Sequence, residues 1–278
     1  MIDERSLIRW LRGADEIFEA LEGRGDAYNL CRRWVEEWFS WGKFCITDED
    51  RKFLKEFELL IFNEKVKSRI EDNLAQLKEQ LESHTKEITF AFSLYLISWN
   101  IRRFETYFER NTTDFSFENF FISLNEVFNK EFLEGLKELR KFHLLKDEIK
   151  RDLVTDIYKK LHQKLREIGT GTQNEPVSTI KIMHIIAPSY IPLLDNPIAE
   201  ALKKEKVCEF FSYRQGRYKG IEIDRDSLIK YMAWIKRKFS SFSDTIFSLE
   251  LEKHKSFLKL LDQAFYIRYS IDIGRRLK

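Results

Sequence analysis

Apolar residues recur along most of the chain at the three- and four-residue steps that place side chains on one face of an α-helix. The pattern predicts helices over residues 3–22, 26–41, 47–63, 66–81, 85–110, 147–168, 178–187, 197–206, 226–240 and 250–270, with two more inside 114–145. Between 147 and 168 the stripe is Ile149, Leu153, Ile157, Leu161, Leu165 and Ile168. These patterns predict an all-α fold.

Two helix positions carry more specific expectations. Thr47, followed by acidic residues at 48–50, predicts a helix start, since a hydroxyl caps free N–H groups and acids favour the first turn. Trp34, Trp38 and Trp41 are spaced to share one helix face, which predicts that all three pack in the core. The alternative for this stripe is a surface that stacks on a base or another ligand.

Glycine and proline are scarce, at 10 and 4 residues, which argues against a many-stranded β fold. Residues 213–223 hold the only predicted strands, at most one small hairpin. All four prolines fall within 176–197, so the composition of this segment differs from that of the rest of the chain. We therefore predict two helical lobes: residues 1–168, and residues 169–278 with the proline-rich segment 176–197 and a basic C-terminal part.

Composition narrows the class of protein. Cys31, Cys45 and Cys208 are an odd number without C-x-x-C spacing, so we expect neither a disulfide framework nor a zinc site, and a cytoplasmic location. The most apolar stretch, 88–101, is too short to span a bilayer, so no membrane partner is expected. No phosphate loop, dinucleotide fingerprint or metalloprotease motif is present, and we expect no cofactor and no metal.

Charge is unevenly distributed. Residues 176–278 hold 19 Lys and Arg against 12 Asp and Glu, whereas residues 1–175 hold 29 against 34. Candidate contacts to nucleic acid in the basic part are Tyr213, Arg214, Arg217, Tyr218 and Lys219 in a loop, with Lys236, Arg237 and Lys238 at a helix end. Cations neutralise phosphates and tyrosines stack on bases. The alternatives are pairing between the two parts of the chain, and cations that stabilise a helix C-terminus.

The proline-rich segment carries the candidate chemistry. A short apolar helix with Lys181 is followed by the turn Ile191-Pro192 and then by Asp195 before the next helix. There Asn196 is the expected cap, with Pro197 at the first helical position. The arrangement resembles helix-hairpin-helix base-excision DNA glycosylases, in which an aspartate follows a proline turn and opens a helix. The resemblance implies that Asp195 is catalytic and that Lys181 is the nucleophilic amine.

The resemblance covers about 30 residues, and the chain lacks the family's L-P-G-x-G hairpin and tetracysteine signatures. A proline turn and an aspartate before a helix are also ordinary helix-start chemistry. The leading hypothesis is therefore a nucleic-acid-associated helical protein. Its more specific form is a diverged DNA-glycosylase-like protein, which would be a glycosylase/lyase if it is an enzyme. The alternative is a non-enzymatic helical protein-interaction or scaffold protein.

Overall fold

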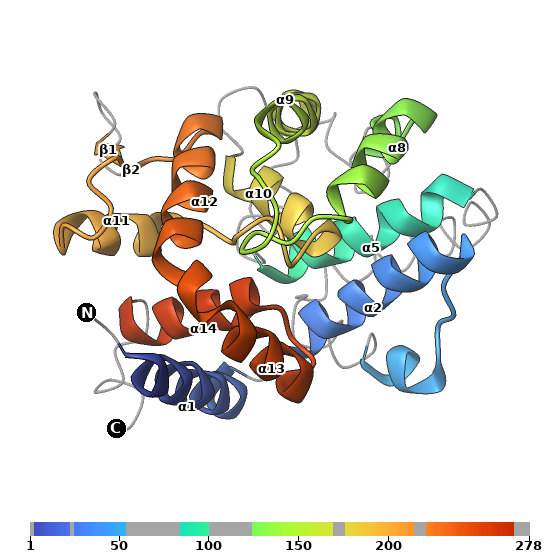
Figure 1. Ribbon diagram of the computed structural model, residues 1–278. Coiled ribbons are helices and arrows are strands. Elements are labelled where there is room, and N and C mark those ends of the chain that lie inside the picture. Colours follow the sequence, from blue (N-terminus) through green and yellow to red (C-terminus); the bar gives the residue numbers. More distant parts are fainter. Residues whose placement is uncertain are drawn as a thin grey trace, which may run out of the picture. The chain divides into compact units, whose positions relative to one another are not determined.

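The computed structural model describes residues 3–22, 25–53, 84–99, 124–168, 176–213 and 221–269, which form an all-α fold with one small hairpin (Figure 1). The helices are α1 (Glu4–Glu22), α2 (Gly25–Trp41), α5 (His84–Trp99), α8 (Lys130–Leu139), α9 (Arg151–Ile168), α10 (Pro176–Ile186), α11 (Asn196–Lys204), α12 (Arg225–Phe239), α13 (Ser243–Lys253) and α14 (Phe257–Tyr269), with the 3-10 helix η1 (Ser240–Phe242). The hairpin pairs β1 (Ser212–Tyr213) with β2 (Ile221–Glu222) in antiparallel register. The predicted fold class and the predicted hairpin are confirmed.

Contacts within the chain divide it into two units, each assembled from separate stretches. The first unit comprises residues 1–25, 135–162 and 175–278, and the second comprises 26–134 and 163–174. Each of the two lobes predicted from the sequence, 1–168 and 169–278, is one continuous stretch, whereas each unit combines several stretches. The two-lobe division stays a prediction.

In the first unit, the N-terminal helix α1 packs against α14 near the other end of the chain. Leu7 and Leu11 of α1 are fully buried. Two aromatic pairs join the helices, Trp10 with Phe265 and Phe18 with Tyr266, each with ring centroids 5.7 Å apart. The first helix of the sequence therefore shares its core with the last described one.

Ion pairs add to this packing at the end of α13 and beyond it. The ammonium of Lys255 lies 2.6 Å from Asp15 and 2.5 Å from Glu19, both on α1. Lys253 lies 3.5 Å from the same Asp15 carboxylate, which is buried. A buried carboxylate needs such partners, because an unpaired charge is costly to remove from water.

The helix predicted over 250–270 is two helices, which corrects the sequence-based expectation. His254 ends α13 in the left-handed conformation, at φ 51°, and Ser256 accepts a hydrogen bond from Lys259 N–H at 3.3 Å. The carboxylate of Glu250 accepts from Phe257 N–H at 2.5 Å. The first turn of α14 therefore has its own capping groups, although the apolar pattern runs on across the break.

In the second unit, the prediction of a tryptophan core is right for two residues and wrong for the third. Trp34 and Trp38 are buried, and the Trp34 ring stacks on Phe44 with centroids 4.9 Å apart. Trp41 is 78% exposed, because α2 ends at this residue and the chain turns at Gly42, whose φ is 74°.

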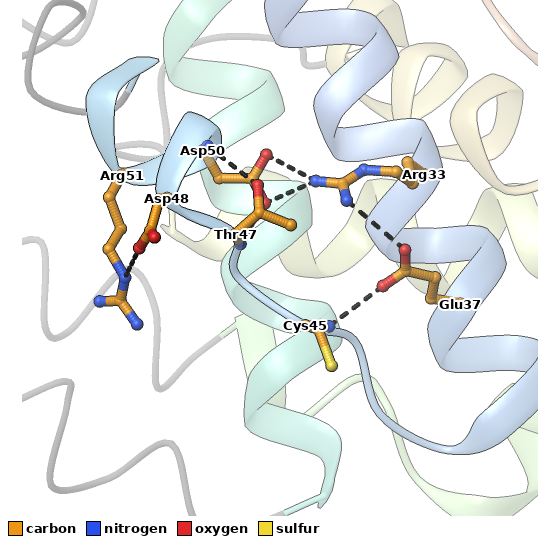
Figure 2. A network of polar contacts seen from close by, with 7 residues as sticks. All are labelled: Arg33, Glu37, Cys45, Thr47, Asp48, Asp50 and Arg51. Carbon is orange, nitrogen blue, oxygen red and sulfur yellow. Dashed lines mark hydrogen bonds and ion pairs between the residues drawn. The ribbon is translucent and has the colours of Figure 1, made fainter.

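The helix start predicted at Thr47 is confirmed. The Thr47 hydroxyl accepts from Asp50 N–H at 3.2 Å, and the Asp50 carboxylate accepts from Thr47 N–H at 2.7 Å (Figure 2). Each side chain thus accepts a hydrogen bond from the backbone N–H of the other residue, which is the reciprocal arrangement of a capping box.

Candidate functional site

The turn between α10 and α11, residues 187–195, is fixed by hydrogen bonds to another segment of the first unit. The Leu144 N–H donates to the carbonyl of Ser189 at 2.9 Å. The hydroxyl of Tyr190, whose side chain is buried, accepts from Lys150 N–H at 2.6 Å. A turn held in this way presents the start of α11 in one position, which a reactive group on it requires.

His184 ties α10 to the same turn. Its imidazole is fully buried, and Nδ1 lies 2.6 Å from the carbonyl oxygen of Ile191. Because a carbonyl only accepts, Nδ1 carries the hydrogen and donates it. The histidine thus fixes the turn before Asp195, a role that the scattered histidines of the sequence do not reveal.

Asp195 opens α11 and is its cap. Its carboxylate accepts from Ile198 N–H at 3.0 Å, and its carbonyl accepts the first helical hydrogen bond, from Ala199 N–H at 3.0 Å. The prediction that Asn196 caps this helix is wrong, because the helix begins one residue earlier and Asn196 is exposed within its first turn. The family resemblance places its aspartate at the opening of a helix, and Asp195 occupies that position.

The environment of Asp195 acts on its charge. Burial raises the pKa of the Asp195 carboxyl above its ordinary value, the hydrogen bond from Ile198 lowers it, and the negative charge of Asp262 raises it again. The positive charges of Lys181 and Lys259 act in the opposite direction, and the net shift in the pKa of Asp195 is upward. Two carboxylates and two ammonium groups therefore interact at this point of the first unit.

Lys181 and Asp195 are the solvent-accessible members of this set. Lys181, on α10, is half-exposed, and so is Asp195. The positive charge of Lys181 lowers the pKa of Asp195, so the two residues that the family resemblance pairs interact electrostatically. A carboxylate can stabilise positive charge that develops on a sugar, and a lysine that has lost its proton can attack carbon.

The other two charges come from α14 and are buried. Lys259 is 2% exposed, and its ammonium lies 3.1 Å from the carboxylate of Asp262. The same ammonium lies 5.3 Å from the centroid of the Phe18 ring, a cation–π contact. The sequence pattern did not include these two residues in the site. Their signal is a lysine and an aspartate three positions apart, inside an otherwise apolar helix.

The residues predicted to contact nucleic acid fall into three groups. Arg214, Arg217, Tyr218 and Lys219 lie outside the described residues. Tyr213 is exposed on β1, with the ammonium of Lys203 5.5 Å from its ring centroid. Lys236, Arg237 and Lys238 occupy the last turn of α12.

Lys236 differs from its two neighbours in its contacts. Its ammonium donates to the carbonyl of Asp147 at 2.7 Å and lies 3.4 Å from that of Leu144. Arg237 and Lys238 are exposed. Arg237 lies thirteen positions after Asp224, the cap of α12, which corresponds to about 20 Å of helix, so the hairpin and this basic end are not adjacent.

Other chemistries find little support in the described part of the chain. There, no group of three or more His, Cys, Asp or Glu side chains could hold a metal ion. Burial raises the pKa of the Cys208 thiol to about 12, so this cysteine stays protonated and is a poor nucleophile. None of the described helices is long and apolar enough to cross a membrane.

Comparisons with known proteins add no family to this description. No family model matches the chain, and neither a curated protein nor a solved structure matches it at a significant level.

Proposed function

We propose that the chain is a nucleic-acid-associated helical protein whose site, Asp195 with Lys181, is a diverged form of the base-excision glycosylase site. The observation that carries the proposal is that a half-exposed Asp195 caps α11 directly after α10, which carries the half-exposed Lys181. The turn before Asp195 is held by His184 and Tyr190, which supports a reactive group with a fixed position.

The chemistry follows from these two groups. When the bond between a base and its sugar breaks, the base leaves with the bonding electron pair and positive charge develops on the sugar. An ionised Asp195 stabilises that charge. A Lys181 that has lost its proton forms a bond to the sugar carbon as the base leaves; the bond from that carbon to the ring oxygen then breaks, the oxygen takes up the proton that the amine gives up, and a Schiff base results. The base would have to leave the stack of the duplex to reach both groups.

An anionic partner is supported by the charge of this part of the chain. Residues 176–278 carry seven more basic than acidic side chains, and Arg237 and Lys238 are exposed. We expect the purified protein to bind DNA or RNA with an affinity that falls steeply with salt, since phosphate contacts release counterions. Binding that is absent at low salt would contradict the proposal.

The enzymatic part is tested by excision and trapping. We expect the protein to release damaged bases from DNA, and borohydride to trap a covalent adduct that disappears in Lys181→Gln. Lys230→Gln is the matched control, since Lys230 is an exposed lysine on α12. An adduct that survives in Lys181→Gln would show that another amine reacts. If wild type binds nucleic acid but neither excises nor traps, only the association remains.

A second candidate function, a non-enzymatic helical protein-interaction protein, is favoured by a different observation. Trp41 and Leu251 are 78% and 76% exposed, and exposed large apolar side chains are common anchors in protein interfaces. Such binding would depend weakly on salt and would be abolished in Trp41→Ala or Leu251→Ala, whereas nucleic-acid binding would persist in both variants.

A further inference from the structure

Three polar residues interrupt the apolar core helix α14. Lys259 and Asp262 form a buried ion pair, and Gln263 is fully buried with neither amide oxygen nor amide nitrogen hydrogen-bonded. Polar groups in such a position cost free energy, and an apolar pair of similar volume is often as stable or more stable. A contribution to the stability of α14 therefore does not explain why Lys259 and Asp262 are buried there.

The position of α14 indicates what the pair acts on. Helix α11 packs against α14, and Asp195 is the cap at the start of α11. The ammonium of Lys259 is fixed by Asp262 at 3.1 Å and by the Phe18 ring at 5.3 Å. The pair is thus a fixed set of charges on the helix against which α11 packs, and both of its charges act on Asp195.

We propose that Lys259 and Asp262 are positioning residues for Asp195: Lys259 favours its ionised form, and Asp262 fixes Lys259 and opposes that ionisation. The inference rests on the proposed function for its catalytic meaning, but not for its electrostatics. Neither residue touches the substrate. Together with burial, the balance between them sets the pH at which Asp195 is available as a carboxylate.

The charged and titratable groups around Asp195 come from three helices. Lys181 belongs to α10, Lys259 and Asp262 belong to α14, and Tyr231 on α12 is fully buried, where the charges of both carboxylates act on it. Because burial keeps the pKa of Tyr231 well above its ordinary value, this residue stays neutral at working pH. Besides burial, the ionisation of Asp195 is therefore opposed by Asp262 and favoured by the two lysines.

The two positioning residues act with opposite sign, which gives a sharp experiment. Aspartate side chains are labelled with carbon-13 and titrated by NMR, and the Asp195 signal is identified by its absence in Asp195→Asn. In Asp262→Asn we expect the pKa of Asp195 to fall. In Lys259→Met we expect the pKa of Asp195 to rise, because the positive charge of Lys259 lowers it. Shifts in the same direction, or none, would overturn the proposal.

Matched controls are an exposed pair that joins the end of α14 to the end of α11. Arg268 of α14 pairs with Glu205 at 3.1 Å, and both side chains are exposed. Arg268→Met and Glu205→Gln remove the same kinds of charge, yet they should leave the titration of Asp195 unchanged. A general effect of net charge would instead move it in all four variants.

Two further readouts keep the test decisive. If a variant of the buried pair fails to fold, the wild-type protein still answers, because the NMR signal of a carboxylate that is coupled to a second titrating group follows a biphasic curve, whereas the signal of an uncoupled one follows a single step. If excision is found, the acidic limb of its pH profile should move up in Lys259→Met and down in Asp262→Asn. Shifts of the NMR titration in a protein that excises nothing would refute the proposed function and leave the positioning pair standing.

Discussion

Both carboxylate oxygens of Asp50 lie 2.5 Å from one guanidinium nitrogen of Arg33, so that α2 is joined to the start of the next helical segment (Figure 2). Burial raises the pKa of the Asp50 carboxyl. The hydrogen bond from Thr47 N–H and the Arg33 guanidinium together lower it by a larger amount. The net effect is a lowered pKa. The ionised carboxylate therefore stabilises the folded second unit.

We expect Asp50→Asn to lower the free energy of unfolding by about 1.5–3 kcal/mol at pH 7, the usual contribution of a hydrogen bond to a charged group. Because the pKa of Asp50 is lowered in the folded state, its contribution is present above the ordinary aspartate pKa of about 3.9. The contribution disappears as pH falls through the folded value. Thermal melts of both proteins at pH 7 and at pH 3 measure the difference.

Asp48→Asn is the control for this prediction. Asp48 is in the first turn of the same helical segment, but it is exposed and lies 3.8 Å from Arg51. Its removal should cost only the few tenths of a kcal/mol, roughly, of a surface pair. Equal melting temperatures for Asp50→Asn and wild type at pH 7 would show that the Arg33 ion pair contributes nothing.

A second prediction concerns α1. Leu11 is fully buried where α1 packs on α14, so Leu11→Ala should lower the free energy of unfolding by about 2–5 kcal/mol. Arg9→Ala, an exposed substitution on the same helix, should change it by less than about 0.5 kcal/mol. Urea unfolding followed by circular dichroism compares them. A small effect of Leu11→Ala would mean that α1 is not part of this core.

How much of this fold could be predicted depends on the range of the signal. Ile157, Leu161 and Leu165 are buried as their spacing predicts, because helix periodicity defines a face from neighbouring residues alone. The break at His254 could not be predicted in this way, since a left-handed residue followed by a cap leaves the apolar pattern unbroken. Local patterns determine helix faces well and helix ends less well.

Long-range packing was beyond the sequence pattern. Nothing in the spacing of residues predicts that Lys255 pairs with Asp15, some 240 positions away, and the predicted lobes separate the N-terminal helix from α14. The candidate site shows the same limit. Lys181 and Asp195 were found because they are close in sequence, whereas Lys259 and Asp262 join them only through the packing of α11 on α14.

The third prediction separates structural from binding roles among three adjacent cations. Lys236 donates to the carbonyl of Asp147, so Lys236→Met should lower the free energy of unfolding by about 0.5–1.5 kcal/mol by removing a part-buried hydrogen bond. Replacing the exposed pair, as Arg237→Gln and Lys238→Gln together, should cost at most about 1 kcal/mol, the usual contribution of cations at a helix C-terminus. If the protein binds nucleic acid there, this double variant should flatten the salt dependence by about one unit for each phosphate that the protein no longer neutralises.

Thermal melts and binding titrations at several salt concentrations give both readouts. A salt slope that is unchanged in the double variant, with binding retained, would leave Arg237 and Lys238 as ordinary helix-end cations. A stable Lys236→Met protein with a flatter slope would contradict the structural role of Lys236.

The last prediction uses the double role of Asp195 as cap and as candidate catalyst. Asparagine caps as well as aspartate does, so Asp195→Asn should fold normally, whereas Asp195→Ala lacks the bond to Ile198 N–H and should be about 0.5–2 kcal/mol less stable.

The pH dependence of stability separates the two roles. Because burial raises the pKa of Asp195 in the folded state, wild-type stability falls as pH rises from the ordinary aspartate pKa through the pKa of the folded state. Asp195→Asn does not titrate, and we expect it to equal wild type at pH 3 and to exceed it at pH 7, with any base-excision activity abolished. Calorimetric melts across this pH range measure the difference. If Asp195→Asn is less stable than wild type at pH 7, the ionised carboxylate is structural, and Asp195 does not lower the stability of the folded protein as catalytic groups commonly do.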